Sequence, residues 1–583
     1  MGSSAAPTTA ELNSFASDMS DNYNSEVVLP TAPAQAWRDA VRLFVDLFTW
    51  RSPLLVLYAT NEDAVSHAVK FANQHSVRVS VRSGGNSNLG WGSCDGCLVI
   101  DLSRMQNIEL DVANLQARVQ PGVTNRMLVD EISIHGIALP QGDCPMVCVG
   151  GYTVGGGLAL TSRTLGLNTD AVVEFRVVDA SGDVLVANAT ENSDLFWGLR
   201  GGSGINLGIV VSLLFQGREM PPQILGGHLS FENTPEAAEA MAGTMHDLIW
   251  GAGDPEENRP FGFSMAWVPS DDDPSRTDLK LMGLWLSDDI SRGRAILDNF
   301  TANPGFRADN ITQGTFHDVM QPLMDQYLGF RSLNWTMPDA MIAPPASRDD
   351  FAAFARTVTT AAQRKPEGAM IAWVFAPLGG KVNDFASDAT AFPHRSSAGN
   401  LHMPTIWFVP ELSQEVRAFG QDSLHETRQW WIPSANGSTS DPSSYVNHPS
   451  EYLEDYKSAY WMGNLPRLQD VKRKYDPRNF LSSGQGIIRV DSLPSDQGGS
   501  GSGVVDDGGS DGVIIAVAIL VPLFLIAAIY GGMFLYVTKM GGTLPCKVPG
   551  IPDAAAKSAG GTAGASGDAT VTVNPVAAAA GSS

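Results

Sequence analysis

The chain is poor in basic residues, and this lack excludes one large class of partners. Its 583 residues include 38 Lys and Arg against 62 Asp and Glu, which gives a formal net charge of −24 at pH 7. Binding to a nucleic acid requires Lys and Arg to neutralise phosphates, and the only basic run is the short segment 472–474. We therefore expect no nucleic-acid partner.

Cysteine is also scarce. The chain has 5 cysteines, too few for a scaffold held together by disulfides. Cys94 and Cys97 form a Cys-x-x-Cys pair, but no second pair with zinc-like spacing and no neighbouring histidine accompanies it. The spacing leaves two interpretations open, a local disulfide or two ordinary thiols, and we expect no metal site.

Residues 1–30 lack the apolar run of a secretory signal peptide. In contrast, 513–537 is a stretch of about 25 residues without a charge, long enough at ~1.5 Å per residue to cross a bilayer core of ~30 Å. The alternative is a buried core helix, which the low-complexity Gly, Ser and Asp residues before it disfavour. Acidic residues precede the stretch and Lys539 and Lys547 follow it, which predicts a single-pass membrane protein whose N-terminal body is extracellular or lumenal. Either the true N-terminus is missing from this sequence or the anchor alone directs insertion, and we expect the former.

Five Asn-x-Ser/Thr sequons are consistent with a glycoprotein: Asn188, Asn299, Asn310, Asn334 and Asn436.

The rest of the chain has the composition of a folded protein, with 43% hydrophobic and 17% charged residues. Residues 1–30 are polar, and we expect them to be frayed. From about residue 53 to residue 215, apolar strand patterns alternate with helical ones, as in the helix that Asn61 is expected to cap. From about residue 223, longer strands are followed by helices, which is typical of a sheet with helices on one face.

Two glycine-rich stretches point to a cofactor. The first, Arg82-Ser83-Gly84-Gly85-Asn86-Ser87, follows an apolar extended run and offers backbone N–H groups and an arginine, which suit a phosphate. The second, 142–151, places Cys144 in a glycine-rich turn and is followed by three glycines at 155–157. With 59 glycines in the chain, either stretch alone is more typical of a turn. A flavin dinucleotide held through its diphosphate and through a thioether bond would need both.

These stretches and the motifs after them resemble the FAD-linked oxidoreductases of the vanillyl-alcohol-oxidase type, specifically the berberine-bridge-enzyme-like and oligosaccharide-oxidase branch. The resemblance runs from about Pro53 to Ile488. In chain order it is carried by Val81–Gly85, Gly142-x-Cys144-Pro145-x-Val147, Asp194–Gly202, Asn206–Val210, Phe392–Arg395, Tyr445-Val446-Asn447, Gly463-Asn464-x-x-Arg467-Leu468 and Tyr475-Asp476-Pro477.

The resemblance implies an α+β fold, with a two-lobed FAD-binding domain of the PCMH type and a substrate domain in which helices back an antiparallel sheet. To this the sequence adds a C-terminal single transmembrane helix. The bounds that we expect are 1–35 for an N-terminal polar segment, 36–218 for the FAD-binding domain, 219–444 for the substrate-binding domain, 445–490 for a C-terminal segment that returns to the FAD domain, 491–512 for a linker, 513–537 for the transmembrane helix and 538–583 for a low-complexity tail.

In that family the Ser-Gly-Gly loop holds the flavin diphosphate, and a histidine and a cysteine often tie the flavin covalently. Here Cys144 stands at the cysteine position, whereas Asn86 stands at the histidine position, and an amide nitrogen is too weak a nucleophile to replace imidazole. The resemblance therefore implies FAD attached through Cys144 only. Val147 matches a position that gates oxygen, and its small size resembles that of the oxidases. The cofactor-binding residues that we expect are Arg82, Ser83, Gly84, Gly85, Asn86, Ser87, Cys144, Val147, Gly150, Gly151, Gly155, Gly156, Ile209 and Asn447.

Tyr445, in the family's Tyr-x-Asn motif, is the expected general base, which takes the hydroxyl proton while the neighbouring C–H leaves as hydride. A free tyrosine has a pKa near ~10, so a positive or hydrogen-bonding neighbour must lower it. In plant relatives a Lys and a Gln help to do this. Here Met403 and Thr405 stand in the corresponding stretch, and Leu158 replaces a further family tyrosine.

The resemblance implies a membrane-bound oxidase that acts on a small molecule, whether a sugar, an aromatic alcohol or a secondary metabolite. Hydride would pass from a hydroxyl-bearing carbon to FAD, and the electrons would then pass to O2, giving H2O2. Two alternatives stay open. One is a dehydrogenase with another electron acceptor, and the other is a protein in which FAD is structural and the groove only binds or cyclises a ligand.

Overall fold

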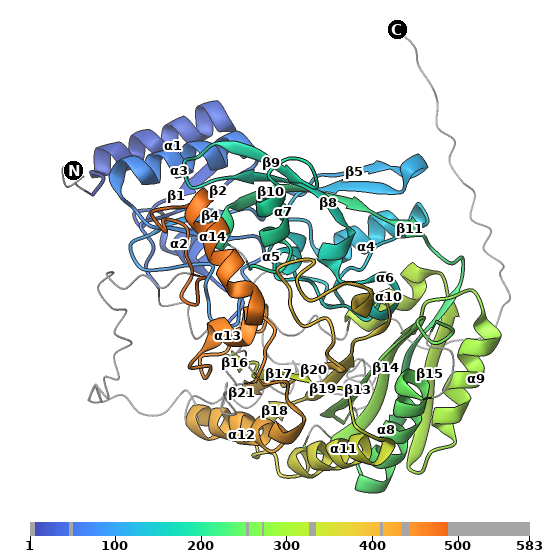
Figure 1. Ribbon diagram of the computed structural model, residues 1–583. Helices are drawn as coiled ribbons and strands as arrows, with labels where there is room; N and C mark the ends of the chain where they lie inside the picture. The colour runs from blue at the N-terminus through green and yellow to red at the C-terminus, as the bar shows by residue number, and fades with distance from the viewer. Residues whose placement is uncertain are drawn as a thin grey trace, which may run out of the picture. The chain divides into compact units, whose positions relative to one another are not determined.

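The computed structural model describes residues 6–45, 51–203, 205–251, 256–270, 273, 275–325, 334–407, 412–433 and 442–487. These residues form two lobes, each built on its own β-sheets (Figure 1). The first lobe contains the residues up to about 220 together with the C-terminal helices, and the second lobe contains the strands and helices between them.

The first lobe contains two sheets. A four-stranded sheet has the order β1 (Glu26–Val28), β2 (Leu55–Tyr58), β4 (Leu98–Asp101) and β3 (Val79–Arg82), with β2, β4 and β3 parallel. A five-stranded antiparallel sheet has the order β5 (Ile108–Asp111), β6 (Gln116–Val119), β10 (Ile209–Gln216), β8 (Val172–Val178) and β9 (Val184–Asn188). The helices of this lobe are α1 (Thr9–Tyr23), α2 (Ala34–Val41), α3 (Glu62–His75), α4 (Asn125–Ile134), α5 (Val149–Val154), α6 (Ser162–Leu165), α7 (Ser193–Leu199), α13 (Tyr456–Trp461) and α14 (Leu465–Tyr475). The short strands β7 (Ile137–Ala138) and β11 (Arg218–Glu219) pair beside them.

The expectation that the first thirty residues are frayed is wrong. Thr9–Tyr23 form helix α1, whose N-terminus is closed by a capping box between Thr8 and Glu11. Phe15 and Met19, one helical turn apart, are buried and join the core cluster around α3. The Thr-x-x-Glu pattern is a start signal for a helix, and two apolar residues at i and i+4 give this otherwise polar helix a buried face.

The expected cap of α3 is confirmed. The side chain of Asn61 accepts a hydrogen bond from the N–H of Ala64 at 2.9 Å, at the start of Glu62–His75. Val65, Ala68 and Val69 of this helix are fully buried in the core cluster that it shares with the four-stranded sheet.

The second lobe is built on a seven-stranded sheet whose paired strands are antiparallel. Its order is β15 (Phe306–Gly314), β12 (Ile224–Phe231), β14 (Thr277–Trp285), β13 (Phe261–Pro269), β19 (Trp373–Pro377), β20 (Gly399–His402) and β17 (Asp339–Ile342). Helices α8 (Pro235–Trp250), α9 (Ile290–Thr301) and α11 (Arg348–Ala362) pack on one face of it, over a large apolar core (Figure 1). A three-stranded sheet, β16 (Asn334–Thr336), β21 (Thr405–Trp407) and β18 (Ala369–Ile371), and the helices α10 (Phe316–Asp325) and α12 (Ser413–His425) complete the lobe.

Buried charged groups join the two lobes. Arg395, in the second lobe, forms two hydrogen bonds of 2.7 Å to the carboxylate of Asp170, and both side chains are almost fully buried. Arg163 of α6 donates to the backbone oxygens of Phe261 at 3.0 Å and Leu378 at 2.5 Å. Because a buried charge is costly unless it is paired and hydrogen-bonded, these contacts fix how the lobes face each other.

The C-terminal segment is tied into the first lobe by a second buried pair. Lys472 of α14 binds Asp476 at 2.7 Å and the carbonyl of Asn206 at 2.6 Å, and neither charged side chain is more than 1% exposed. Asp476 also accepts hydrogen bonds from the N–H groups of Phe480 and Leu481. Leu481 forms a parallel bridge with Val79 of β3, so the C-terminal segment returns to the four-stranded sheet.

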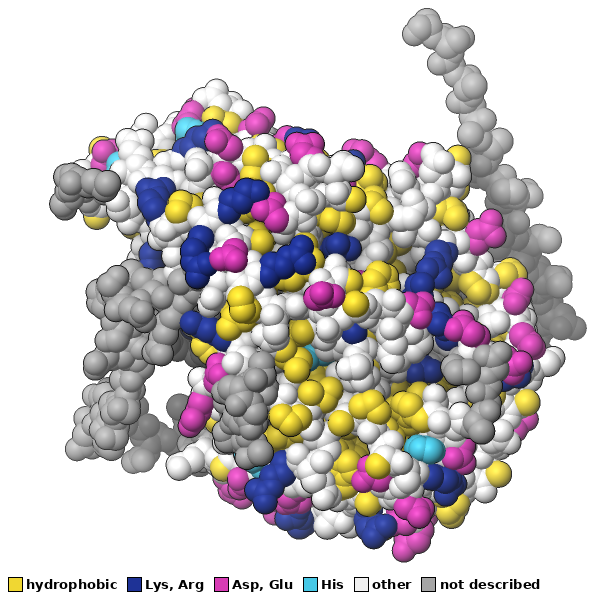
Figure 2. Space-filling view, in the orientation of Figure 1, with side chains coloured by type: hydrophobic (Ala, Val, Ile, Leu, Met, Phe, Trp, Pro, Cys, Tyr) yellow, Lys and Arg dark blue, Asp and Glu magenta, His cyan; other side chains and the backbone are white. Residues whose placement is uncertain are grey.

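The surface carries charges of both signs. On the face shown in Figure 2, Lys and Arg side chains are interspersed with Asp and Glu. Partly exposed ion pairs occur among the described residues, such as Arg259 with Asp384. Among the sequons, Asn299 and Asn310 are exposed, Asn188 is half-buried, and the side chains of Asn334 and Asn436 lie outside the described residues.

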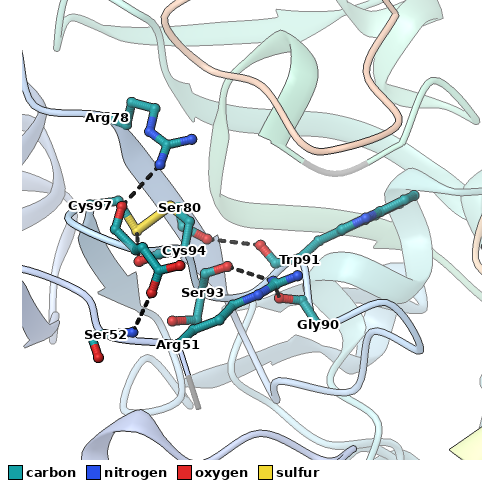
Figure 3. Close-up of a disulfide and its surroundings, with 10 residues drawn as sticks. Arg51, Ser52, Arg78, Ser80, Gly90, Trp91, Ser93, Cys94 and Cys97 are labelled. Atoms are coloured by element: carbon teal, nitrogen blue, oxygen red, sulfur yellow. Dashed lines mark hydrogen bonds between the residues drawn. A yellow bond between two sulfur atoms is a disulfide. The ribbon is translucent and has the colours of Figure 1, made fainter. Parts of the chain in front are cut away.

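Of the two interpretations of Cys94 and Cys97, the structure has the disulfide (Figure 3). The backbone around it is held by Arg78, which donates to the carbonyl of Asp95 at 2.9 Å, and by the N–H of Ser52, which donates to the Asp95 carboxylate at 2.6 Å. No group of metal-ligating side chains is found in the ranges given above.

Among the described residues, no helix has both the length and the apolar character needed to cross a bilayer. The prediction of a C-terminal transmembrane helix, which was part of the predicted fold class, is therefore wrong. The predictions that followed from it are wrong as well: a membrane localisation, an extracellular or lumenal body and a membrane partner. Residues 513–537, on which that prediction rested, lie outside the described residues. The two-lobed α+β architecture is unaffected.

Candidate active site

A cavity of about 540 Å³ lies between the glycine-rich loops of the first lobe and the inner face of the seven-stranded sheet. The residues from Arg82 to Ser87, and Cys144, Val147, Gly150, Gly151, Ile209, Tyr445 and Asn447, all line it. Of the fourteen predicted cofactor-binding residues, all except Gly155 and Gly156 thus line the same cavity as Tyr445. Gly155 and Gly156 do not line it; a Cβ at these positions would collide with Asn447 and Phe392 respectively.

The loop after β3 offers unused hydrogen-bond donors. None of the backbone N–H groups from Ser83 to Ser87 donates to another residue in the described part of the chain. Nδ2 of Asn88, a further donor, is also buried without a hydrogen-bond partner there. Since buried polar groups are nearly always paired in folded proteins, this loop fits an anionic ligand such as the diphosphate of FAD.

Glycines at two positions allow the two loops to pack closely at the cavity. A Cβ at Gly84 would lie 2.6 Å from Oδ1 of Asn86, and one at Gly150 would lie 2.5 Å from Oγ of Ser83. Gly85 has φ = +70°, a conformation that side chains rarely adopt. At Gly151, by contrast, a Cβ would meet nothing within 4 Å, so the backbone there borders open space.

Arg82 is placed differently from the sequence-based expectation. It lines the cavity, but its Nε binds the buried carboxylate of Asp101 at 2.6 Å and its Nη2 donates to the carbonyl of Ala40 at 2.5 Å. The arginine charge is therefore already neutralised within the protein. The loop offers a phosphate its backbone N–H groups rather than a free cation.

The second loop places thiols and a carboxyl at the cavity wall. Cys144 is partly exposed and Cys148 is buried, and neither forms a disulfide. Asp143 precedes Cys144, and within the described residues its carboxyl accepts one hydrogen bond, from the N–H of Leu160 at 3.4 Å. Burial raises the pKa of Asp143 from 3.8 to about 7, which the hydrogen bond only partly opposes.

Tyr445 lies at the centre of a set of hydrogen-bond donors. Its phenol oxygen accepts from the N–H of Gly157 at 2.9 Å, the N–H of Leu158 at 3.3 Å and Nδ2 of Asn447 at 2.9 Å. Burial raises the pKa of Tyr445 to about 12, because it outweighs these three donors, which act in the opposite direction. The hydrogen-bonding neighbours that act to lower the pKa of Tyr445 are thus these three N–H donors.

Sequence reasoning missed a polar network behind Tyr445. Asp339 of β17 accepts hydrogen bonds from the hydroxyl of Ser444, from the N–H of Tyr445 at 3.0 Å and from Nδ2 of Asn400 at 2.7 Å. Oδ1 of Asn400 in turn lies 3.0 Å from Nδ1 of His402. Burial raises the pKa of Asp339 to about 7 and lowers that of His402 to about 4.

Met403 and Thr405, the residues singled out in this stretch, do not line the cavity. Met403 is fully buried in the core on the helix side of the sheet, whereas Asn400, His402, Pro404 and Ile406 line the cavity. Alternate residues of a strand face opposite sides of the sheet. The sequence prediction was shifted by one residue along this strand, so it selected the residues on the face away from the cavity. The alternation of polar Asn400 and His402 with apolar Leu401 and Met403 was the available signal.

A second histidine, His448, lies at this end of the cavity. The ring of His448 lies 4.9 Å from that of Tyr445 and 5.1 Å from that of His402, measured between centroids. Burial holds the pKa of His448 well below its usual range. At neutral pH both histidines are therefore uncharged hydrogen-bonding groups.

Two family models match the chain. Residues 53–188 match the FAD binding domain, and residues 444–488 match the domain described as berberine and berberine like. The chain is 27% identical over 463 residues to the FAD-linked oxidoreductase YvdP of Bacillus subtilis, and the aligned region covers 76% of this chain and 93% of that protein. It is 27% identical over 456 residues to the chitooligosaccharide oxidase of Gibberella zeae, which covers 75% and 87%.

Solved structures share the fold. A glucooligosaccharide oxidase from Acremonium strictum has a TM-score of 0.69 at 19% identity, over 82% of this chain and 99% of that one. The 6-hydroxy-D-nicotine oxidase from Arthrobacter nicotinovorans has a TM-score of 0.67 at 21% identity, over 79% and 97%.

Proposed function

Because the chain is an FAD-linked oxidoreductase of the berberine-bridge-enzyme-like and oligosaccharide-oxidase group, we propose that it oxidises a hydroxyl-bearing carbon of a small molecule in the cavity. The observation that carries this proposal is the set of three N–H donors on the phenol oxygen of Tyr445. Bound FAD supplies the hydride acceptor and the route for electrons to O2. Tyr445 supplies the general base.

The chain's own residues divide the work of binding FAD. The N–H groups of Ser83 to Ser87 would hold the diphosphate, and Asn447 and Ile209 would contact the flavin. Cys144 forms the single covalent link, a thioether, and Asn86 forms none. The glucooligosaccharide oxidase is described as carrying a 6-S-cysteinyl, 8α-N1-histidyl FAD. The side chain of Cys144 is partly exposed, forms no disulfide and lines the cavity, which supports the cysteine half of such an attachment here.

Tyr445 acts by accepting the substrate's hydroxyl proton at its phenol oxygen. A phenolate in this place is stabilised by the N–H groups of Gly157 and Leu158 and by Asn447, as in other sites where preorganised donors meet a developing negative charge. Since burial raises the pKa of Tyr445 to about 12, the basic form gains population as the pH rises. Catalysis should therefore strengthen through the alkaline range.

O2 is the proposed electron acceptor. Val147 is small, partly exposed and at the cavity wall, which supports access of a small gas molecule to the bound cofactor. A dehydrogenase with another electron acceptor is the second candidate, because the support for O2 as the acceptor comes from this one side chain.

Anaerobic mixing with candidate alcohols tests the proposal. A substrate should bleach the flavin absorption, and admission of air should restore it with one H2O2 per substrate. Tyr445→Phe should keep its flavin and lose about 10²–10⁴-fold in rate, the range for general base catalysis. Tyr456→Phe is the matched control, since this partly buried phenol binds the carbonyl of Gly486 away from the cavity.

Failure of reoxidation in air after normal bleaching would favour the dehydrogenase. Full activity in Tyr445→Phe would remove Tyr445 from the mechanism. Flavin that no alcohol bleaches would contradict the oxidation of alcohols as a whole.

A further inference from the structure

Resting on the proposed function, we propose that Tyr152 is a positioning residue for the general base: it fixes the hydrogen-bond donors that surround the phenol oxygen of Tyr445. Tyr152 belongs to α5 and lines the cavity. It is not among the residues that the sequence predicted for the site. Its hydroxyl, its carbonyl and its ring each contact a different part of the donor set.

The hydroxyl of Tyr152 holds one of the donors through the main chain. It donates a hydrogen bond of 2.7 Å to the carbonyl of Leu158, the residue whose N–H donates to Tyr445 at 3.3 Å. In the described part of the chain, no other group donates to this carbonyl. The main chain of Leu158 is therefore held on both sides, by Tyr152 at its C=O and by Tyr445 at its N–H.

The backbone carbonyl of Tyr152 holds a second donor. Nδ2 of Asn447 donates to this carbonyl at 2.9 Å and to the phenol oxygen of Tyr445 at 2.9 Å. An amide nitrogen carries two hydrogens, so the two bonds use both of them and set the plane of the amide. Asn447 therefore cannot turn its N–H away from Tyr445 without losing its bond to Tyr152.

The ring of Tyr152 packs beside the turn that carries the third donor. Gly157 donates its N–H to Tyr445 at 2.9 Å. A Cβ at Gly157 would lie 2.9 Å from Cε1 of Tyr152, and one at Gly142 would lie 3.1 Å from Cε2. Because both positions are glycines, the ring approaches closely both this turn and the loop that carries Cys144.

Tyr152 therefore acts on catalysis through Tyr445. Donors that are held in place stabilise the phenolate, and they matter most as negative charge develops on this oxygen. Without the Tyr152 hydroxyl, the carbonyl of Leu158 loses its partner, and the N–H groups at 157 and 158 gain freedom to move away from the phenol oxygen. Removal of this hydroxyl should thus slow proton transfer and leave substrate binding unchanged.

A double-mutant cycle separates this role from a general structural one. Tyr152→Phe removes only the hydroxyl and keeps the ring in its contacts with Gly142 and Gly157. With a substrate identified by flavin bleaching, we expect Tyr152→Phe to lower kcat about 3–10-fold with little change in KM. In the Tyr445→Phe background the donors have no phenol oxygen to stabilise, so the same substitution should change kcat by less than about twofold.

Tyr460→Phe is the matched control. Tyr460 is buried and its hydroxyl donates to Gln485 at 2.7 Å, but it does not line the cavity. Loss of this hydroxyl should leave kcat within about twofold of wild type. If Tyr152→Phe lowers kcat equally in the wild-type and Tyr445→Phe backgrounds, the inference is overturned, because the effect does not pass through the base. An equal decrease in Tyr460→Phe would overturn it as well.

A second measurement does not depend on turnover. The chain has 11 tyrosines, and labelling their Cζ atoms with an NMR-active carbon isotope gives resonances whose positions respond to hydrogen bonding at the phenol oxygen. The resonance of Tyr445 is the one that Tyr445→Phe removes from the spectrum of the holoprotein. It should move in Tyr152→Phe and stay in place in Tyr460→Phe. A Tyr445 resonance that does not move in Tyr152→Phe would contradict the inference.

The two experiments separate failure of this inference from failure of the proposed function. Full activity in Tyr445→Phe would refute Tyr445 as the base, whereas a Tyr445 resonance that moves in Tyr152→Phe would still support Tyr152 as the residue that fixes the donors. An unmoved resonance together with an inactive Tyr445→Phe would refute the role of Tyr152 and keep the base.

Discussion

Replacing Asp143 by asparagine should stabilise the protein, and it should do so only at neutral and alkaline pH. Burial raises the pKa of Asp143 from 3.8 to about 7. Because the folded state binds this proton more tightly than the unfolded chain does, wild-type stability falls as the pH rises from about 4 to about 7. An asparagine side chain does not titrate, so Asp143→Asn escapes this loss.

The size of the effect follows from the shift. A shift of about 3 pKa units corresponds to about 4 kcal/mol, at about 1.4 kcal/mol per unit. Asp143 keeps part of its surface exposed to the cavity, where water screens the charge. We therefore expect Asp143→Asn to raise the free energy of unfolding by about 2–4 kcal/mol at pH 8 and by nearly nothing at pH 4.

Urea unfolding of the holoprotein at several pH values measures this difference. The exposed carboxyl of Asp298 on α9 gives the control, Asp298→Asn, for which we expect little change at either pH. A difference between Asp143→Asn and wild type that does not vary with pH, or a variant less stable than wild type at pH 8, would refute the reasoning.

The other predictions concern the covalent link, the base and the joint between the lobes. Cys144→Ala should release all its flavin on denaturation, whereas Cys148→Ala should keep it attached; mass spectrometry of the peptides decides. The ratio kcat/KM should rise with pH through the alkaline range, because Tyr445 has a pKa raised to about 12, and a plateau below pH 8 would point to another base. Arg395→Leu leaves the carboxylate of Asp170 buried without its partner and should lower the free energy of unfolding by about 3–5 kcal/mol in urea titrations.

Local signals in the sequence were sufficient for the cofactor loops. The Ser-Gly-Gly stretch after an apolar strand and the cysteine in a glycine-rich turn need no knowledge of distant residues, and both stretches line the cavity. The cap at Asn61 is similarly local. In α1 the local signal was present, in Thr8 and Glu11, but the polar composition of the segment concealed it.

The residues that sequence reasoning missed depend on contacts between distant segments. Asp339 and His402 meet because β17 pairs with β20, and nothing near either residue in the sequence records that pairing. Asp143 was passed over beside Cys144, because its raised pKa comes from burial in a cavity that exists only when the two lobes meet. Arg82 showed the opposite error, since its local context suited a phosphate while Asp101, on the neighbouring strand, pairs with its charge.

The most direct test of the account is the visible absorption spectrum of the purified protein before and after denaturation. FAD held in the cavity and linked through Cys144 predicts a yellow protein whose colour stays with the polypeptide after unfolding and proteolysis, on the peptide that contains Cys144. A protein that is colourless as purified, and that stays colourless after refolding with FAD, would contradict the central claim.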